Sequence, residues 1–466
     1  MLGISVLKVG TNRGAPRVWV SCENARRAGF EPGQRFVVQR SGKGLLIKLA
    51  PEGERIVSQK KRGERTVPVI DINSKETLSP VAGCEVVRVV FGRGQIYVSA
   101  LASELRRQER LERVKRHVAQ GGLSTGGIAL GGGILSHAVH QGIKDSGLMP
   151  HMLMANEIRE ELVDHALEHN DALSQYTVVL NAPLQEVAFD DEVLKRLQPV
   201  DLVDCGIPCS GASVAGKARN KNAMMEDHEH VGHLIAAAIA MLVKLNPIGI
   251  LWENVPQYAS TASAAILRKQ LSELGYHVQE RQFLGTDWGE LEARQRWCLV
   301  AMTKGIAFDL QSVTPPVFEQ RKLSDVFDPV PLDDPSWSPM TYLKDKEVRD
   351  KAAGKGFRMQ LFTGGENSIS TLTKGMAKRR STDPFFVNPS NPELLRLPTV
   401  AEHARMKGVP EHLVANVGIT LGHEILGQAV VYTPFRLIAK AVAEAIKRFA
   451  AGHEVVAPMA GFKAAA

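Results

Sequence analysis

Residues 200–213 read VDLVDCGIPCSGAS, an apolar run that gives way to a turn rich in Pro, Gly and Ser. The apolar run before Gly206 predicts a short buried strand, and the turn after it predicts converging backbone N–H groups. Cys209 lies on this turn without apolar neighbours, which favours a lowered thiol pKa and nucleophilic attack. Cys205, inside the apolar run, is interpreted as a core residue.

Outward from this stretch, short apolar runs alternate with helical patterns. The predicted strands are 152–157, 177–183, 248–255, 277–284 and 294–302, and the predicted helices are 159–169, 190–198, 233–245 and 264–274. This alternation is typical of βαβ units and a mostly parallel sheet buried on both faces. The fold class is therefore α/β, and ligands are expected at the carboxyl ends of the strands.

Polar residues follow these predicted strands where a ligand would bind. Glu253 follows an apolar strand beside Trp252, so its carboxyl group is expected to keep a proton near neutral pH and to serve as a general acid or hydrogen-bond donor. Arg294 and Arg296 lie two residues apart on one predicted strand. Both are therefore expected to point to one face and reach one anionic or carbonyl-rich ligand.

A glycine-rich segment precedes strand 152–157. It holds seven glycines in residues 121–133 and is interpreted as a loop that lets the backbone approach a ligand closely. Glu157 follows the strand, where an acidic side chain can accept hydrogen bonds from ribose hydroxyls. A flexible loop and a solvated strand end are the alternative interpretations.

The first hundred residues have a different pattern, with short β-rich runs separated by glycine and charged turns. A shift of 50 residues aligns Gly33 with Gly83, Gly42 with Gly92 and Gly44 with Gly94, which indicates a diverged duplication. The pattern resembles the AbrB-type swapped-hairpin fold. That resemblance implies a DNA-binding module, and a β-rich dimerisation or docking module is the alternative. Residues 100–119 predict a charged linker helix.

Composition excludes several classes of protein. The chain has 466 residues, 44% of them hydrophobic and 23% charged, as in ordinary globular proteins rather than disordered ones. Five scattered cysteines without a C-x-x-C pair argue against a disulfide framework and a zinc cage, so no metal is predicted.

No apolar run is long enough for a membrane span or signal peptide, which predicts a cytoplasmic protein, nucleoid-associated when bound to DNA. The 57 basic and 50 acidic residues give a charge of +7, which permits a polyanionic partner.

Together the strand-end residues resemble the DNA (cytosine-5)-methyltransferase family over residues 121–450. The matching segments are Pro208-Cys209-x-x-x-Ser213, Glu253-Asn254-Val255, Thr286-Asp287-Trp288-Gly289 with Arg294-x-Arg296, Ala155-Asn156-Glu157, the run from Arg396 to Pro410, and Leu426-Gly427-Gln428-Ala429-Val430. The resemblance implies a Rossmann-like domain that uses S-adenosylmethionine, with a small target-recognition domain. It also implies double-stranded DNA as the partner and methylation of a flipped cytosine.

The resemblance assigns roles to individual residues. Cys209 would add to cytosine C6, Glu253 would hold the N3 and N4 edge, Arg296 would bind O2, and Arg294 would bind the flanking phosphate. The cofactor would be bound by Gly131, Gly132, Gly133, Glu157, Ile158, Pro208, Gln428 and Ala429, with the glycines making room for it. DNA would be bound by Ser213, Lys374, Lys378, Arg379 and Arg380. Ser210, Ala212, Glu292 and Gln428 depart from the family pattern.

The predicted domains follow from these motifs. They are a duplicated β-rich module (1–105), a linker (106–120), a catalytic domain (121–314), a target-recognition domain (315–390), a return to the catalytic domain (391–450) and a tail (451–466). Residues 341–381 hold ten basic and four acidic residues, a charge of +6. Residues 315–390 are poor in helical pattern, and 341–381 is interpreted as facing duplex phosphates, with a solvated charged loop as the alternative; this segment leaves the rest of the chain near neutral.

Three functions remain open on the sequence. The first is a cytosine-5 DNA methyltransferase, the second is a degenerate relative that binds DNA without catalysis, and the third is an RNA cytosine-5 methyltransferase. The N-terminal module also permits a homodimer.

Overall fold

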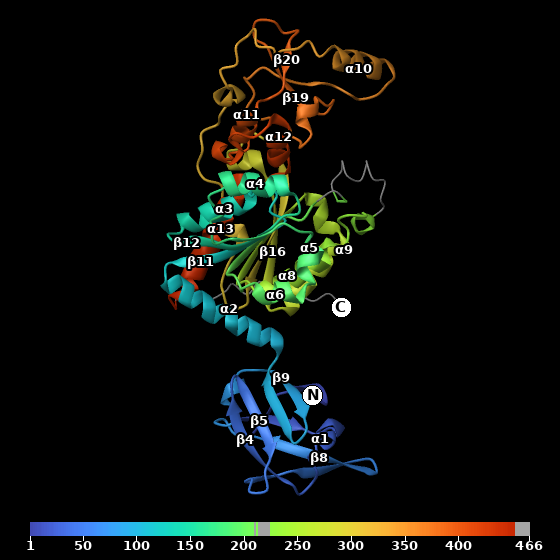
Figure 1. The fold of residues 1–466 in the computed structure, drawn as a ribbon, viewed down its shortest axis with the longest axis vertical. Helices are drawn as coiled ribbons and strands as arrows, with labels where there is room; N and C mark the ends of the chain where they lie inside the picture. Colours follow the sequence, from blue (N-terminus) through green and yellow to red (C-terminus); the bar gives the residue numbers. More distant parts are fainter. Residues whose placement is uncertain (209–210, 213–223, 453–466) are drawn as a thin grey trace. The chain divides into compact units, whose positions relative to one another are not determined.

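The computed structural model describes residues 1–208, 211–212 and 224–452. The chain divides into two compact units, Met1–Glu109 and Arg110–Ala466 (Figure 1). Helix α2 (Ala102–Ala119) spans this division. Among the described residues, no helix is both long and apolar enough to cross a membrane.

The N-terminal unit is built from two antiparallel sheets around one apolar core. The first sheet has the order β1 (Gly3–Lys8), β9 (Val86–Gly92), β10 (Gln95–Ala100), β5 (Gly44–Leu49), β4 (Arg35–Ser41) and β6 (Arg55–Ile56). The second has the order β2 (Gly10–Asn12), β3 (Ala15–Val20), β8 (Arg65–Ile72) and β7 (Ser58–Arg62). The unit also contains α1 (Glu23–Arg27) and η1 (Ser79–Val81).

Two hairpins of this unit repeat each other, but not in the predicted register. Ser41 pairs with Gly44 across the β4–β5 turn, and Gly92 pairs with Gln95 across the β9–β10 turn, so this repeat is offset by 51 residues. The alignments of Gly42 with Gly92 and of Gly44 with Gly94 were therefore one residue out of register. The β2–β3 turn, where Asn12 pairs with Ala15, and the β7–β8 turn, where Arg62 pairs with Arg65, keep the predicted offset of 50. The second copy thus gains one residue ahead of its hairpin.

The larger unit contains a seven-stranded sheet. Its order is β13 (Val178–Leu180), β12 (Met149–Asn156), β11 (Gly122–Ile128), β14 (Leu202–Cys205), β15 (Gly249–Asn254), β17 (Gln295–Thr303) and β16 (Tyr276–Leu284). Neighbouring strands are parallel except for β17, which runs antiparallel to both β15 and β16. The segment 121–133 was predicted to be a loop, yet most of it forms the central strand β11. Its glycines carry little strand propensity, so tertiary pairing on both sides decides its conformation.

Helices cover both faces of this sheet (Figure 1). Residues alternate along each strand between two cores, so Leu251 packs in the core that contains α3 and α13, and Ile250 packs in the core that contains α8 and α9. Besides α10 (Thr341–Ala352), the described helices of this unit after α2 are α3 (Ile134–Asp145), α4 (Glu160–His169), α5 (Leu184–Ala188), α6 (Asp191–Arg196), α8 (Leu234–Leu245), α9 (Ala262–Glu273), α11 (Val400–Met406), α12 (Ile419–Gln428) and α13 (Tyr432–Ala450). Short 3₁₀ turns are η2 (Met225–Asp227), η3 (Pro256–Ser260), η4 (Gly285–Trp288), η5 (Leu310–Ser312), η6 (Leu323–Val326), η7 (Met376–Lys378) and η8 (Glu411–Val414).

The region predicted for target recognition holds a small sheet of β18 (Gln360–Phe362), β19 (Pro384–Val387) and β20 (Leu395–Arg396). It also contains the twelve-residue helix α10 (Thr341–Ala352), which corrects the expectation of a region without helical pattern. Only Leu343 is buried on this helix, so apolar periodicity could not reveal it. Lys344 and Lys346 on α10 pair with Glu393 and Asp350, which neutralises part of the predicted basic patch.

Helix α11 begins with a buried ion pair that joins it to β20. Thr399 caps the helix by accepting a hydrogen bond from the Glu402 N–H, and both oxygens of Glu402 accept from Arg396 at 2.7 Å. Asp328 N also donates to Glu402. Fully buried, this carboxylate depends on Arg396 for its counter-charge.

Arg396→Met is expected to lower the free energy of unfolding by about 3–5 kcal/mol, because it leaves the Glu402 carboxylate buried without its partner. Arg349→Met, on the exposed face of α10, is expected to change it by less than about 0.5 kcal/mol. Urea denaturation of both variants provides the measurement. Equal losses would contradict this account of the ion pair.

Candidate active site

Glu253 and Arg296 meet at one end of the central sheet. Glu253 lies near the end of β15, Arg296 lies near the start of the antiparallel strand β17, and Arg296 Nε is 2.6 Å from Glu253 Oε1. Burial raises the pKa of Glu253, while the positive charges of Arg296 and Arg294 oppose this rise. The structure thus places a carboxyl group that tends to keep its proton, Glu253, beside the fixed positive charge of Arg296.

The chain that leads to Cys209 is tied to this pair, although Cys209, Ser210 and Ser213 lie outside the described residues. Asn254 Nδ2 donates to the Ile207 carbonyl at 3.1 Å, which joins the segment after β14 to the end of β15. A Cβ built on Gly206 would lie 3.6 Å from Glu253 Oε2, and Pro208 is exposed. Asn254 therefore fixes the carbonyl of Ile207, two residues before Cys209, a role that the sequence motif did not reveal.

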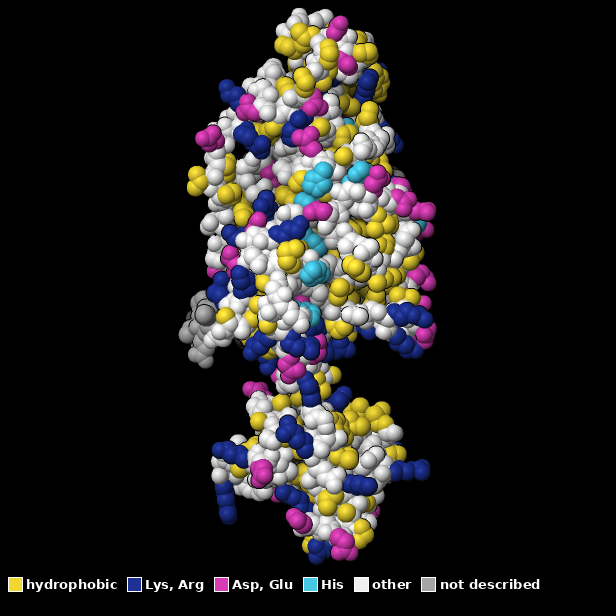
Figure 2. Space-filling model, turned by 60° about the vertical axis from the view of Figure 1, so that its left-hand side comes forward, with side chains coloured by type: hydrophobic (Ala, Val, Ile, Leu, Met, Phe, Trp, Pro, Cys, Tyr) yellow, Lys and Arg dark blue, Asp and Glu magenta, His cyan; other side chains and the backbone are white. Residues whose placement is uncertain are grey.

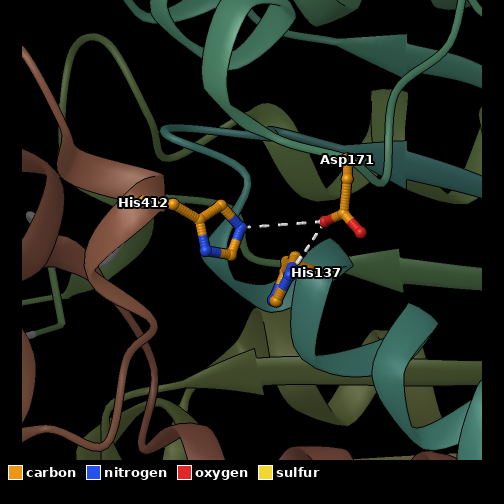
Figure 3. Close-up of side chains that lie close together, drawn as sticks. All are labelled: His137, Asp171 and His412. Atoms are coloured by element: carbon orange, nitrogen blue, oxygen red, sulfur yellow. Dashed lines mark ion pairs between the residues drawn. The ribbon is translucent and has the colours of Figure 1, made fainter.

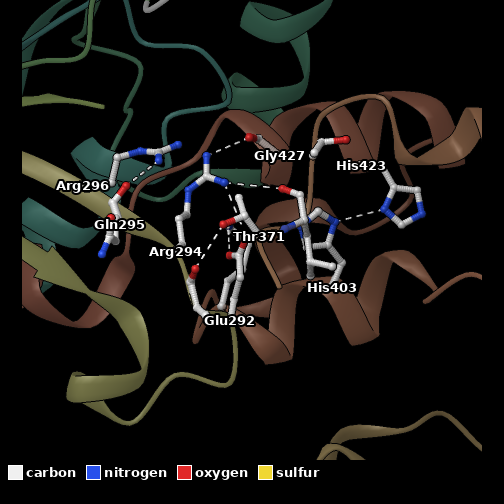
Figure 4. A network of polar contacts seen from close by, with 12 residues as sticks. Glu292, Arg294, Gln295, Arg296, Thr371, His403, His423 and Gly427 are labelled. Atoms are coloured by element: carbon white, nitrogen blue, oxygen red, sulfur yellow. Dashed lines mark hydrogen bonds and ion pairs between the residues drawn. The ribbon is translucent and has the colours of Figure 1, made fainter. Parts of the chain in front are cut away.

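Arg294 does not share the surroundings of Arg296, contrary to the expectation for residues two apart on a strand. It precedes β17, is 2% exposed, and donates to the carbonyls of Leu372 at 3.4 Å and Gly427 at 2.8 Å (Figure 4). Its guanidinium thus joins β17 to the segment before η7 and to α12. Its guanidinium is buried against these carbonyls, and the predicted contact with a flanking phosphate stays a prediction.

A buried ion pair lies beside Arg294. Lys407 Nζ contacts Glu292 Oε2, and both side chains are fully buried. Burial alone would raise the pKa of Glu292, but the positive charges of Lys407 and Arg294 hold it below its ordinary value. Glu292, which departs from the family pattern, is thus one member of a buried pair of opposite charges with Lys407. The sequence marked Glu292 as a departure from the family pattern, but it did not identify Lys407 as its ion-pair partner.

The predicted cofactor residues gather around Glu157 at the end of β12. Glu157 Oε2 accepts a hydrogen bond from Gly131 N at 2.7 Å, and Oε1 accepts from Ile158 N at 2.9 Å and Arg159 N at 3.0 Å. Ile158 is 61% exposed although it is apolar. A buried carboxylate beside an exposed apolar side chain suits a ligand with hydroxyl groups and a flat ring.

Gln428 joins the same neighbourhood from α12. Its Nε2 donates to Glu424 Oε1 at 3.0 Å, and Glu424 accepts from Arg159 Nη1 at 2.7 Å. Ala429 is buried directly after the helix. The structure therefore connects the predicted C-terminal cofactor residue Gln428 to Arg159, next to Ile158.

Two of the three turn glycines pack against other segments on the side where a Cβ would lie, and their predicted role toward the cofactor stays a prediction. A Cβ on Gly132 would meet Ile425 Cγ2 at 2.5 Å, and a Cβ on Gly133 would meet Asn170 Nδ2 at 2.2 Å. These glycines permit close packing against α12 and the end of α4. Only a Cβ on Gly131 would meet nothing within 4 Å among the described residues, so this glycine borders open space.

Asp204 lies in β14 beside the start of α3. Its Oδ1 accepts from Ser136 Oγ at 2.6 Å, and its Oδ2 is buried without a hydrogen-bond partner among the described residues. Burial raises the pKa of Asp204 from 3.8 to about 7. The folded protein thus holds a proton on Asp204 at pH values where the unfolded chain has released it.

This raised pKa gives a signed dependence of stability on pH. The contribution of Asp204 is complete below pH 3.8 and is lost as the pH rises to about 7, at up to about 1.4 kcal/mol per pH unit. Asp204→Asn removes this titration, so the wild type is expected to lose stability relative to the variant between pH 4 and 7, and the difference is expected to stay constant at higher pH. Urea denaturation at successive pH values checks this, and parallel curves throughout would contradict it.

The basic residues predicted to contact DNA are exposed near the joint made by Arg294. Lys374, Lys378, Arg379 and Arg380 are all exposed. A Cβ on Gly427 would meet Lys374 N at 2.1 Å, which shows how closely this segment packs on the end of α12. The exposed Lys374 therefore lies on the segment beside Gly427, the residue before Gln428, and Arg294 binds the Leu372 carbonyl of the same segment.

Comparison with known proteins gives matches over the larger unit. The sequence profile of the family described as C-5 cytosine-specific DNA methylase matches residues 151–447. The chain is 23% identical over 269 residues to the type II methyltransferase M.SsoII of Shigella sonnei, covering 54% of this chain and 68% of that protein. It is 34% identical over 119 residues to the type II methyltransferase M1.HgaI of Avibacterium volantium, covering 24% and 33%. The fold is similar to the S. pombe Dnmt2 methyltransferase, with a TM-score of 0.51 at 15% identity, covering 69% and 97% of the two chains.

Proposed function

Because this chain belongs to the C-5 cytosine-specific DNA methylase family, we propose that it transfers a methyl group from S-adenosylmethionine to C5 of a cytosine in duplex DNA. The observation that carries this proposal is the Glu253–Arg296 pair at the end of β15, where the next residue, Asn254, binds the carbonyl of Ile207, two residues before Cys209. Residues 121–314 and 391–450 are proposed as the catalytic domain, and residues 315–390 as the recognition domain.

The proposed chemistry begins with the thiolate of Cys209. Its sulfur forms a bond to C6 of cytosine, and the electron pair displaced from the C5–C6 bond makes C5 nucleophilic. A protonated Glu253 donates to N3 and Arg296 donates to O2, so both stabilise the charge that builds on the ring. After C5 gains the methyl group, it loses its proton, the C5–C6 double bond re-forms and the sulfur–C6 bond breaks.

The residues around Glu157 fit the proposed methyl donor. S-Adenosylmethionine supplies an electrophilic methyl group, and its adenosine carries ribose hydroxyls and a flat base. Glu157 would accept from one ribose hydroxyl with the Oε2 lone pair that its three backbone partners leave, Ile158 would contact the base, and Gly131 borders the space. Gln428 and Pro208 would lie at the edge of the same site.

Radiolabelled S-adenosylmethionine tests this function. We expect label in duplex DNA, recovered as 5-methylcytosine after hydrolysis, and no label in RNA of the same sequence. Label in RNA alone would replace DNA with RNA as the substrate. DNA and cofactor binding without transfer would instead support a binding protein, and the proposed methyl transfer would be wrong.

We also propose that the N-terminal unit contributes to DNA binding. Met1–Glu109 holds 19 basic and 10 acidic residues, a charge of +9. The remainder holds 38 basic and 40 acidic residues, so the net charge does not come chiefly from residues 341–381 as predicted.

Every residue of β7 is exposed, including Lys60, Lys61 and Arg62. A two-stranded ribbon with such a strand has the width to enter a major groove. Homodimerisation through this unit stays a prediction.

Replacement of Lys60, Lys61 and Arg62 by Gln is expected to lower the slope of log affinity against log salt for duplex DNA by about 2–3, since each phosphate contact contributes about 0.9. The matched control replaces Lys8, Lys75 and Arg93, which are exposed elsewhere on the same unit. Fluorescence anisotropy across a salt series measures both. If the two triple variants lower the slope equally, the ribbon is not the contact.

A further inference from the structure

Three side chains from separate segments converge beside the start of α3. His137 lies in the first turns of α3, Asp171 follows the end of α4, and His412 lies in η8 (Figure 3). Asp171 Oδ1 is 2.9 Å from His137 Nε2 and 3.9 Å from His412 Nε2, and the three ligand atoms lie within 4.8 Å of one another. None of these residues takes part in the proposed methyl transfer.

These distances suit a small divalent transition metal. Zinc binds histidine nitrogen and aspartate oxygen at about 2.0–2.2 Å, so two ligands of a tetrahedral ion lie about 3.4 Å apart. The two distances from Asp171 Oδ1 fall on either side of this value, and the side chains of Asp171 and His412 are half exposed and free to adjust. Two imidazoles and one carboxylate are the borderline donors that Zn²⁺ prefers.

The surroundings of His137 are those of a metal-ligating histidine. It is 1% exposed, and Tyr432 Oη contacts its Nδ1 at 2.7 Å, which fixes the ring so that Nε2 faces Asp171. Gln141 Nε2 lies 3.3 Å from the same Nε2 and would give way to an ion. Lys144 Nζ contacts Asp171 Oδ2 at 3.0 Å, so only Oδ1 is left to bind a metal.

We propose that His137, Asp171 and His412 form a binding site for one Zn²⁺ ion, with water as the fourth ligand. The ion would connect α3, the segment after α4 and η8, which are otherwise joined here by the carboxylate of Asp171. Asn170, next to Asp171, donates to the Gly133 carbonyl at 2.9 Å at the start of α3. Zinc would therefore stabilise the glycine turn. Figure 2 shows several exposed histidine side chains on one face of the larger unit.

The full-length protein, stripped of metal with a chelator, tests the site by calorimetric titration with Zn²⁺. We expect one ion per chain, with affinity lowered at least about 100-fold in His412→Ala and unchanged in His277→Ala, an exposed histidine outside the cluster. His412 is half exposed, so its loss should not prevent folding. Lys144→Met is expected to tighten binding several-fold, because it removes a cation that competes for Asp171.

Cobalt titration gives a second readout. Tetrahedral Co²⁺ at this site should produce visible absorption that His412→Ala and Asp171→Asn abolish. Failure to bind Zn²⁺, or binding that His412→Ala and Lys144→Met leave unchanged, would overturn the proposal and leave the cluster as an ion pair between segments.

Discussion

Cys209→Ala is expected to lower kcat for methyl transfer by at least about 10⁴-fold while binding of DNA and S-adenosylmethionine persists. Without the thiolate no bond forms to C6, so C5 stays a poor nucleophile however well the substrates are held. Methyl transfer to duplex DNA under single-turnover conditions measures the effect. Cys205→Ala, in the buried strand β14, is the matched control and is expected to cost stability with little change in kcat.

A Cys209→Ala protein that retains more than about a tenth of the wild-type rate would contradict the assignment of the nucleophile. If Cys205→Ala were the inactive variant instead, the assignment of the two cysteines would be reversed. Burial raises the pKa of Cys205 well above its ordinary value, which argues against that outcome.

Glu253→Gln is expected to lower kcat by about 10²–10⁴-fold with little change in DNA affinity, because the amide keeps the shape of the side chain but cannot deliver a proton to N3. Glu273→Gln, exposed on α9, serves as the control. Rates at saturating substrate are compared from pH 5 to 9.

The pH profile separates catalysis from packing. Burial raises the pKa of Glu253, so the wild-type rate should decline as the pH rises through this pKa, whereas Glu253→Gln should lack that decline. Loss of stability alone would lower the rate without changing the profile. A variant that keeps both wild-type rate and wild-type profile would exclude Glu253 from proton donation.

Sequence reasoning predicted the α/β fold and the family, and both are confirmed. Strand ends were predictable because apolar runs such as 248–255 mark buried strands independently of their partners. The same reasoning failed at β11, whose glycines favour no regular structure and which becomes a strand only by pairing with β12 and β14.

Contacts between distant segments could not be predicted. The burial of Arg294 depends on carbonyls 78 and 133 residues away, and Lys407 lies 115 residues from Glu292. The sequence also does not show that Ile425 and Asn170 pack against Gly132 and Gly133. The individual roles of the site residues therefore remain predictions for mutagenesis.

The covalent intermediate is the most direct test of the proposed mechanism. The protein is incubated with S-adenosylmethionine and duplex DNA that carries 5-fluorocytosine, from which the fluorine at C5 cannot leave as a proton does. We predict a protein–DNA adduct that survives denaturation in the wild type and is absent in Cys209→Ala. Absence of the adduct from wild-type protein with confirmed binding of DNA and cofactor, or an adduct that persists in Cys209→Ala, would contradict the account.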